Sequence, residues 1–352
     1  MSKSSSVSYP RVLDGLSMER LLARIRENNA VDMTSAEQFI PFTVGHENIG
    51  YVRRDLWEAK LVHFPDVLQL SSGSIRFTPS LEAAESLSRS TALARVTSSL
   101  KLDGTIAGWR DELVEATSDF NRPPAFLIER AAYPFFGIRG YGVHINGFIR
   151  NPVDRKVMKL WVARRSKTKS TFPSMLDHIV AGGLPTGVSL AENVVKECDE
   201  EASIPEHIAL EASPVGIVSY TTLDAQSNLK RDVLFCYDLG EPCNFDSTLC
   251  HNHNSLLIVE LPPEFIPIPR DGEVESFELQ EMEWVLDRLM EGGPTGYKPN
   301  CNLVIIDFLI RYSLYMTFMS GILIATPIRQ GLISPQSPDY IKLIQGLRNN
   351  VF

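Results

Sequence analysis

The chain has 352 residues, of which 44% are hydrophobic and 22% charged, and this length and composition predict about two domains with packed cores. Its formal net charge is −9 at pH 7, so we do not expect a general nucleic-acid-binding protein, which needs basic residues to neutralise phosphates. The five cysteines are few and odd in number, which favours a reducing compartment, and we expect the protein in the cytoplasm.

Neither a membrane span nor a leader is expected from the sequence. The most apolar run, 316–328, has about 13 residues, fewer than the roughly 20 that a bilayer requires. The serine-rich residues 1–10 lack the apolar centre of a signal peptide, and we predict that they form a disordered tail.

Apolar spacing and turn residues divide the remainder into an α+β domain over 11–139 and a second domain over 140–352. In the first, the patterns predict a helix at 16–29, the start of another at 35–39, strands around 51–52, 67–70 and 74–77, helices at 81–88 and 92–100, and a strand at 126–129. In the second, they predict strands at 143–148, 157–163, 179–183, 216–220 and 233–237, and helices at 281–290 and 303–310.

The segment after the glycine pair 182–183 carries the best indication of function. Residues 189–192, Ser-Leu-Ala-Glu, form a capping box that starts a helix. Glu197, Glu200 and Glu201 follow at spacing i, i+3, i+4, so one helical turn brings three like charges together. A divalent cation relieves such repulsion, and hard cations such as Mg²⁺ bind carboxylate oxygens. A solvated acidic helix face is the alternative, but the glycine pair upstream favours a metal site.

This segment resembles the box of the Nudix hydrolases, G-x5-E-x7-R-E-U-x-E-E-x-G-U, in which U is a bulky apolar residue. Aligned from Gly182, the chain has Lys196 at the position of the arginine and Ile204 as the closing apolar residue. It departs from the pattern at Val188, where the first glutamate is usual, and at Ser203, where a glycine is usual. The first departure puts the bracing between loop and helix in question more than metal binding.

The resemblance implies a metal-dependent hydrolase. The positions that bind the metal in the family, Mg²⁺ or Mn²⁺, are matched by Glu197, Glu200 and Glu201. Glu200 or Glu201 is the candidate catalytic base, and Lys196 is expected to orient a carboxylate as the family arginine does.

The resemblance extends from about residue 40 to the C-terminus. Over this length the chain is similar to one branch of the family, the thiamin pyrophosphokinase-related Nudix proteins. It implies a Nudix fold, an α-β-α sandwich with a mixed β-sheet between helices, preceded by a smaller α+β domain. It also implies hydrolysis of the phosphoanhydride of thiamine diphosphate analogues, especially oxidised or damaged ones, to monophosphates. The segments that carry this resemblance are 108–112, 129–132, 136–138, 141–147, 271–275 and 298–301.

Five residues are candidates to bind the substrate diphosphate. Arg164, Arg165 and Lys167 follow a predicted strand and could present guanidinium and ammonium groups to phosphate oxygens. A solvated basic turn is about equally consistent with this pattern. Gly182 and Gly183 of the glycine loop are assigned to the same substrate-binding role.

Two further pairs of polar residues leave alternatives open. Glu273 and Glu275 are candidates for an outer metal ligand or a base, because their segment can loop toward the box; a solvated turn is the alternative. His144 and Asn146 could line a cavity for the organic part of the substrate, or form a satisfied pair of interior hydrogen bonds.

Two stretches, 240–259 and 312–329, interrupt the resemblance and are interpreted as insertions or as retained introns. The codons at both pairs of ends can hide splice signals, and sequencing of the mature transcript tests this. The alternative for the first stretch is a zinc site, because thiolate and imidazole are ligands that zinc prefers. Its ligands would be Cys243, Cys250, His251 and His253.

Two other functions compete with the thiamine-related one. The first is a Nudix hydrolase of oxidised nucleoside triphosphates or other nucleoside diphosphate derivatives, which the box does not distinguish. The second is a non-catalytic diphosphate-binding module. In every case the expected partner is a small-molecule diphosphate, and the sequence does not determine the oligomeric state.

Overall fold

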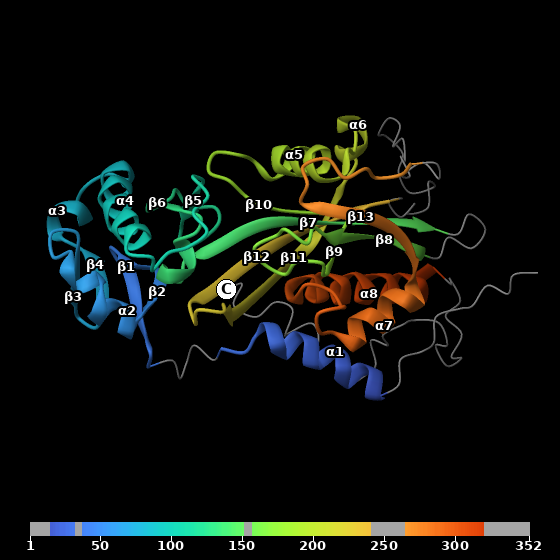
Figure 1. Ribbon diagram of the computed structural model, residues 1–352, viewed down its shortest axis with the longest axis horizontal. Helices are drawn as coiled ribbons and strands as arrows, with labels where there is room; N and C mark the ends of the chain where they lie inside the picture. The colour runs from blue at the N-terminus through green and yellow to red at the C-terminus, as the bar shows by residue number, and fades with distance from the viewer. Residues whose placement is uncertain (1–14, 32–36, 151–156, 241–264, 320–352) are drawn as a thin grey trace, which may run out of the picture.

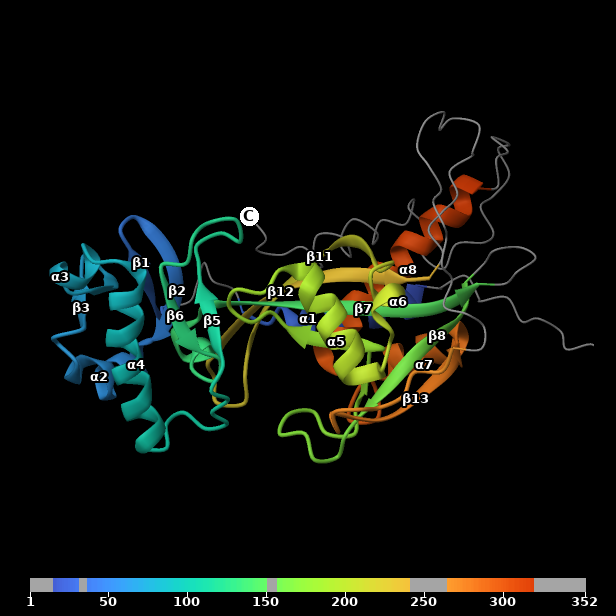
Figure 2. The same ribbon diagram turned by 90° about the horizontal axis from the view of Figure 1, so that it is seen from above.

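The computed structural model describes two packed units that lie one after the other along the long axis of the molecule (Figures 1 and 2). The predicted tail at 1–10, the cysteine and histidine cluster of the first interruption, and part of the second lie outside the described residues. The described residues are 15–31, 37–150, 157–240 and 265–319.

The N-terminal unit is built on a four-stranded sheet with strand order β2-β1-β4-β3 and a two-stranded sheet of β5 and β6. Phe42 lies at the centre of its core, with its ring 5.4 Å from that of Phe77 and 5.5 Å from that of Phe126. The elements are β1 (Phe39–Val44), β2 (Glu47–Arg53), α2 (Arg54–Ala59), the 3-10 helix η2 (Leu61–His63), β3 (Leu68–Ser71), β4 (Ser74–Phe77), α3 (Pro79–Glu82), α4 (Ser86–Leu102), β5 (Leu113–Ala116), β6 (Phe126–Glu129) and the 3-10 helix η3 (Tyr133–Phe136).

Two predicted helices of this unit differ from the structure. Phe39, expected in the start of a helix, begins β1. The helix expected at 81–88 is instead divided between the short α3 and the start of α4, whereas the helix expected at 92–100 lies within α4. Leu93, Val96 and Leu100 of α4 are all buried, because spacings of three and four residues place them on one face of a helix.

The second unit is a seven-stranded sheet with strand order β11-β12-β7-β8-β13; in addition, β10 pairs with β7 and β9 pairs with β8. The sheet is mixed, because β12 and β7 run parallel whereas the other pairs are antiparallel. Its strands are β7 (Arg139–Arg150), β8 (Val157–Arg165), β9 (Leu176–Asp177), β10 (Val180–Gly183), β11 (Ser213–Leu223), β12 (Leu229–Leu239) and β13 (Val274–Glu281).

Helices cover both faces of this sheet, so the unit is the predicted α-β-α sandwich (Figure 1). The helices α5 (Leu190–Ala202) and α6 (Glu206–Ala209) lie on one face, and α1 (Gly15–Asn28), α7 (Met282–Glu291) and α8 (Pro299–Met319) lie on the other. Residues 300–310 of α8 are all buried, as expected of a helix that is apolar on most of its surface, and the polar residues among them are Asn300, Asn302 and Asp307.

Helix α1 packs on the second unit, although the sequence boundary at 139 would place it in the first. Its apolar residues Met18, Leu21, Leu22 and Ile25 share one buried cluster with α7 and α8. The amphipathic stripe of α1 therefore covers α8, which needs apolar neighbours on all sides. The chain leaves this unit after α1 and returns to it at β7.

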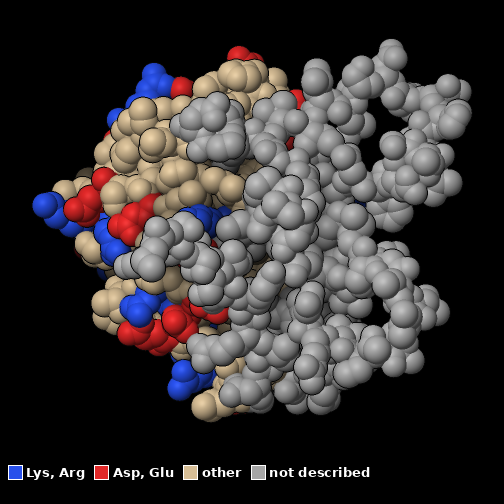
Figure 3. Space-filling model, turned by 90° about the vertical axis from the view of Figure 1, so that its right-hand side faces the viewer, with Lys and Arg blue, Asp and Glu red and all other residues tan. Residues whose placement is uncertain are grey.

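Two observations describe the surface and the helices with respect to possible partners. No helix in the described part of the chain combines the length and apolar character that a bilayer crossing needs. On the face seen in Figure 3, the described acidic and basic side chains are interspersed, without one continuous basic area.

Candidate active site

The acidic helix α5 begins and ends as the box pattern requires. The Ser189 hydroxyl accepts a hydrogen bond from the Glu192 amide at 3.3 Å, and the Glu192 carboxylate accepts one from the Ser189 amide at 2.9 Å, which completes the predicted capping box. Ser203 ends the helix in the left-handed conformation, with φ of 52°, which explains why glycine is usual there. Its hydroxyl donates to the Ile268 carbonyl at 3.0 Å, an interaction that glycine cannot make.

The three box carboxylates lie in different surroundings. Lys196 Nζ lies 3.0 Å from Glu197 Oε1 and 2.8 Å from Glu200 Oε2, so it orients two carboxylates, as predicted. The Glu197 side chain is 13% exposed and that of Glu200 is 48% exposed. Glu201 is buried.

Glu201 is the box carboxylate whose ionised form is least favoured by its surroundings. Its Oε2 accepts a hydrogen bond from the Ala181 amide at 2.8 Å, which fixes it against β10. Burial raises the pKa of Glu201 well above the ordinary carboxyl value, and the nearby acidic groups, including Glu197 and Glu273, raise it further. A bound cation would reverse this effect, because it favours the ionised form.

Two further carboxylates approach Glu201 from the loop before β13. One oxygen each of Glu201, Asp271 and Glu273 lie within 4.8 Å of one another. Carboxylate oxygens are the donors that hard divalent cations prefer, and Glu201 is a buried acid that makes no ion pair with any described basic residue, so the residues present fit a Mg²⁺-like ion. Of the predicted trio, only Glu201 belongs to this group; Asp271 and Glu273 come from outside the box, and Glu197 and Glu200 pair with Lys196 instead.

Glu273 and Glu275 are separated by the structure. Burial acts to raise the pKa of Glu273, but the hydrogen bond and charge of Lys169 lower it overall, so Glu273 stays ionised at neutral pH. Glu275 is exposed and sits where the pairing of β13 with β8 shifts register, between Val274 and Ser276. Of the two predicted candidates, Glu273 is the one beside Glu201.

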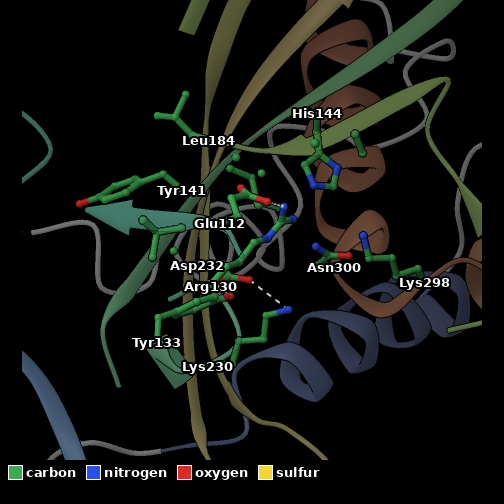
Figure 4. Close-up of a pocket in the computed structure, with 17 residues that line it drawn as sticks. Glu112, Arg130, Tyr133, Tyr141, His144, Leu184, Lys230, Asp232, Lys298 and Asn300 are labelled. Atoms are coloured by element: carbon green, nitrogen blue, oxygen red, sulfur yellow. Dashed lines mark hydrogen bonds and ion pairs between the residues drawn. The ribbon is translucent and has the colours of Figure 1, made fainter. Parts of the chain in front are cut away.

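A pocket of about 140 Å³ opens beside β10, between the two units (Figure 4). The N-terminal unit contributes Glu112, Arg130 and Tyr133 to its wall. The remaining residues that line it, from the second unit and the junction, include Tyr141, His144, Gly182, Gly183, Lys230, Asp232, Lys298 and Asn300.

Strand β10 separates this pocket from the acidic helix, and its two glycines face opposite ways. A Cβ atom added to Gly182 would lie 2.1 Å from Cδ of Glu197, whereas one added to Gly183 would lie 2.7 Å from Nη2 of Arg130. Because β10 is hydrogen-bonded to β7 alone among the described strands, its other edge connects the two sides. Arg130 stands at this connection, paired with Glu112 at 2.7 Å.

Three basic side chains line the pocket, and Lys298 has the longest ion-pair distance of them. Lys230 lies 3.3 Å from Asp232, and Lys298 lies 3.7 Å from Asp177. Asp177 is already held by Arg165 at 2.7 Å. Burial acts to lower the pKa of Lys298, but Asp177 raises it overall, so Lys298 is a half-buried cation that can accept an anionic ligand.

The predicted basic residues of the 164–167 turn do not line this pocket. The Arg165 guanidinium donates to Asp177 and to the Phe172 and Thr171 carbonyls at 2.7, 3.0 and 3.0 Å, so three of its five N–H donors are used within the protein. Arg164 donates to the Ser174 carbonyl at 3.0 Å, and Lys167 is exposed. Gly182 and Gly183, in contrast, line the pocket, and their substrate-binding role stays a prediction.

Sequence reasoning missed most of the pocket residues. Of the pair His144 and Asn146, Asn146 lies in the interior, where its side-chain amide donates a hydrogen bond to Asp238 at 3.0 Å. His144 lines the pocket. Some of the missed residues shared one signal, because they lie in the segments that carry the family resemblance: Glu112, Arg130, Lys298 and Asn300, with Asp271 at the acidic group. Tyr133, Lys230 and Asp232 lie outside those segments and carried no such signal.

Comparison with known proteins decides the family. The chain is 39% identical over 313 residues to "Nudix hydrolase 24, chloroplastic" of Arabidopsis thaliana, covering 89% of this chain and 73% of the relative. It is 41% identical over 322 residues to "Nudix hydrolase 20, chloroplastic" of the same plant, with the same coverage. The chain belongs to the Nudix hydrolase family. Nudix hydrolases act on diphosphate bonds of small molecules and generally use divalent metal ions, so this chain is a hydrolase of phosphorus-containing anhydrides.

Two other comparisons describe parts of this Nudix chain. Residues 20–140 match a family described as a domain of unknown function, DUF4743. Among solved structures, the MutT protein of Methanosarcina mazei is 16% identical, with 51% of this chain and 95% of that one covered at a TM-score of 0.31. An Ap4A hydrolase of C. elegans is 13% identical, with 52% and 98% covered at a TM-score of 0.29.

Proposed function

We propose that this chain is a Mg²⁺- or Mn²⁺-dependent, cytoplasmic diphosphatase of thiamine diphosphate analogues, above all oxidised or damaged ones. Water adds to one phosphorus and the phosphoanhydride breaks, which releases the monophosphate and inorganic phosphate. The observation that carries the chemistry is the convergence of Asp271 and Glu273 on the buried carboxylate of Glu201.

The box carboxylates Glu197, Glu200 and Glu201 would hold the ion, with Glu273 beside them. A divalent ion bound there neutralises charge on phosphoryl oxygens and lowers the pKa of an attacking water. Glu273 is ionised, because Lys169 lowers its pKa, and it lies beside Glu201, so it is in position to accept a proton from that water. Glu201, which the Ala181 amide holds against β10, is in position to bind the ion. Two acids in contrasting surroundings thus take different roles.

The pocket would hold the organic part of the substrate, with the diphosphate passing the outer edge of β10 toward α5. Arg130 and Lys298 are the cations placed to contact the phosphates along this path. A volume of about 140 Å³ is below the ~300 Å³ of typical ligand sites, which disfavours a whole dinucleotide as the substrate.

The substrate proposal is supported by where the branch-specific segments meet. Residues 108–112, 129–132, 141–147 and 298–301 are far apart in the sequence, yet each contributes a side chain to this one pocket. Features that distinguish the branch from other Nudix proteins therefore gather where the non-phosphate part of a substrate would bind.

Hydrolysis of a substrate panel, followed by chromatography of the phosphorylated products, tests the proposal. With Mg²⁺ present, we expect the highest kcat/KM for oxothiamine and oxythiamine diphosphates, followed by thiamine diphosphate. We expect little activity with an oxidised nucleoside triphosphate or a nucleotide sugar. A Glu200→Gln/Glu201→Gln variant should be inactive, and Glu206→Gln, at an exposed position on α6, should match wild type.

Each failure has its own meaning. Faster hydrolysis of the nucleotides would remove the substrate proposal and keep the metal chemistry. Equal inactivity of wild type and the double variant toward every diphosphate would leave the binding-module alternative.

A further inference from the structure

A second group of metal-ligating side chains lies beneath the pocket, apart from the acidic helix. His144 comes from β7, His178 follows β9, and Cys301 lies in the first turn of α8. One ligand atom from each lies within 4.8 Å of the others, and the residues are 4%, 3% and 0% exposed. The two imidazole rings meet edge to face, with centroids 5.0 Å apart. Three distant segments therefore bring soft donor atoms to one buried point.

The imidazole nitrogens of this group lack protein partners. Nδ1 of His144 and both ring nitrogens of His178 are buried and make no hydrogen bond to any described residue. Buried polar atoms are nearly always paired with protein, ordered water or an ion. A histidine with both nitrogens buried and unpaired thus indicates a missing ligand at this point.

Both histidines are available as neutral donors, which metal coordination requires. Burial lowers the pKa of His178 to about 4, an effect that Lys298 reinforces and Asp177 opposes. Burial also lowers the pKa of His144 well below its ordinary value, with His178 and Lys298 acting in the same direction. At neutral pH each ring therefore has an unprotonated nitrogen.

We propose that His144, His178 and Cys301 bind a Zn²⁺ ion. Imidazole nitrogen and thiolate sulfur are the donors that zinc prefers, whereas Mg²⁺ selects oxygen, so this site is chemically distinct from that of Glu201. Three protein ligands leave a fourth position, and because His144 lines the pocket, a water or a pocket ligand can fill it.

Binding replaces a hydrogen bond of Cys301 by a bond to the metal. In the structure, the Cys301 thiol donates to Oδ1 of Asp177 at 2.9 Å. On binding, the thiol proton leaves to solvent and the sulfur lone pair forms the zinc bond, with no change of oxidation state. Lys298 and Arg165 already place two positive charges near Asp177. The charge added by zinc is therefore expected to draw an anion, such as hydroxide, to the fourth position.

Metal analysis and cobalt spectroscopy on the full chain test the site. We expect one zinc per purified chain, and Co²⁺ added after its removal should give an absorption band of thiolate-to-cobalt charge transfer. Cys301→Ser should abolish that band, and His178→Gln should weaken the affinity by more than about 100-fold. Cys236→Ser is the matched control, because Cys236 is equally buried and lies outside the group.

A second control addresses the cysteines outside the described residues. A Cys243→Ser/Cys250→Ser variant should keep the ion if the buried group binds it; loss of the ion there would overturn the assignment. The assignment also fails if wild type binds neither zinc nor cobalt, or if Cys301→Ser keeps the charge-transfer band. If Cys301→Ser does not fold, the metal content and cobalt spectrum of the wild type and of the Cys243→Ser/Cys250→Ser variant still test the proposal.

Discussion

Replacement of Gly182 by alanine is expected to disable the acidic site without changing any carboxylate. The added Cβ would lie 2.1 Å from Cδ of Glu197, so that carboxylate must move by about 1.4 Å to regain an ordinary carbon contact of ~3.5 Å. Gly182 does not have a left-handed φ, so the backbone accepts alanine without strain. A displacement of about 1 Å at a reacting centre can cost ~10²-fold in rate, and we expect kcat to fall by that order.

Gly183→Ala is the matched control, because its Cβ points toward Arg130 on the pocket side. Initial rates of phosphate release are measured over a range of Mg²⁺ and substrate concentrations for both variants. Gly182→Ala should lower kcat and require more Mg²⁺, whereas Gly183→Ala should raise KM and keep the Mg²⁺ dependence. Wild-type turnover and Mg²⁺ dependence in Gly182→Ala would refute a role for Glu197 in binding the ion.

Three further predictions test the acidic group and the pocket. The folded-state pKa of Glu201 is raised, so its favourable contribution to stability is complete below the ordinary carboxyl pKa and is lost as the pH rises through the folded value. With EDTA present, Glu201→Gln should therefore melt at a higher temperature than wild type at pH 8, by a margin that shrinks toward pH 4; equal margins at both pH values would contradict this. Glu273→Gln should lower kcat by ~10²-fold or more, as expected for loss of a general base, while Glu275→Gln stays within about twofold, and similar rates for the two would remove Glu273 as the base. Lys298→Gln should raise KM by about tenfold and Lys167→Gln should not, which steady-state kinetics with a diphosphate substrate will show.

Features encoded by neighbouring residues could be predicted from the sequence. The capping box at 189–192 and the spacing of the three glutamates depend on contacts within one or two helical turns, so the pattern alone specifies α5. The sandwich architecture also followed, because the family resemblance covers the strands and helices that form it. Lys196 contacts two box carboxylates for the same local reason.

Contacts between distant segments were decided by the tertiary structure alone. The sequence pattern offers Arg165 as a phosphate ligand and treats Glu273 and Glu275 alike. Packing of β9 beside β8 gives Arg165 its partner Asp177, and the register shift in β13 leaves Glu275 exposed while Glu273 reaches the acidic group. A local pattern records which groups a segment offers, but their charge state and their partners depend on burial and on neighbours that only the folded sheet brings together.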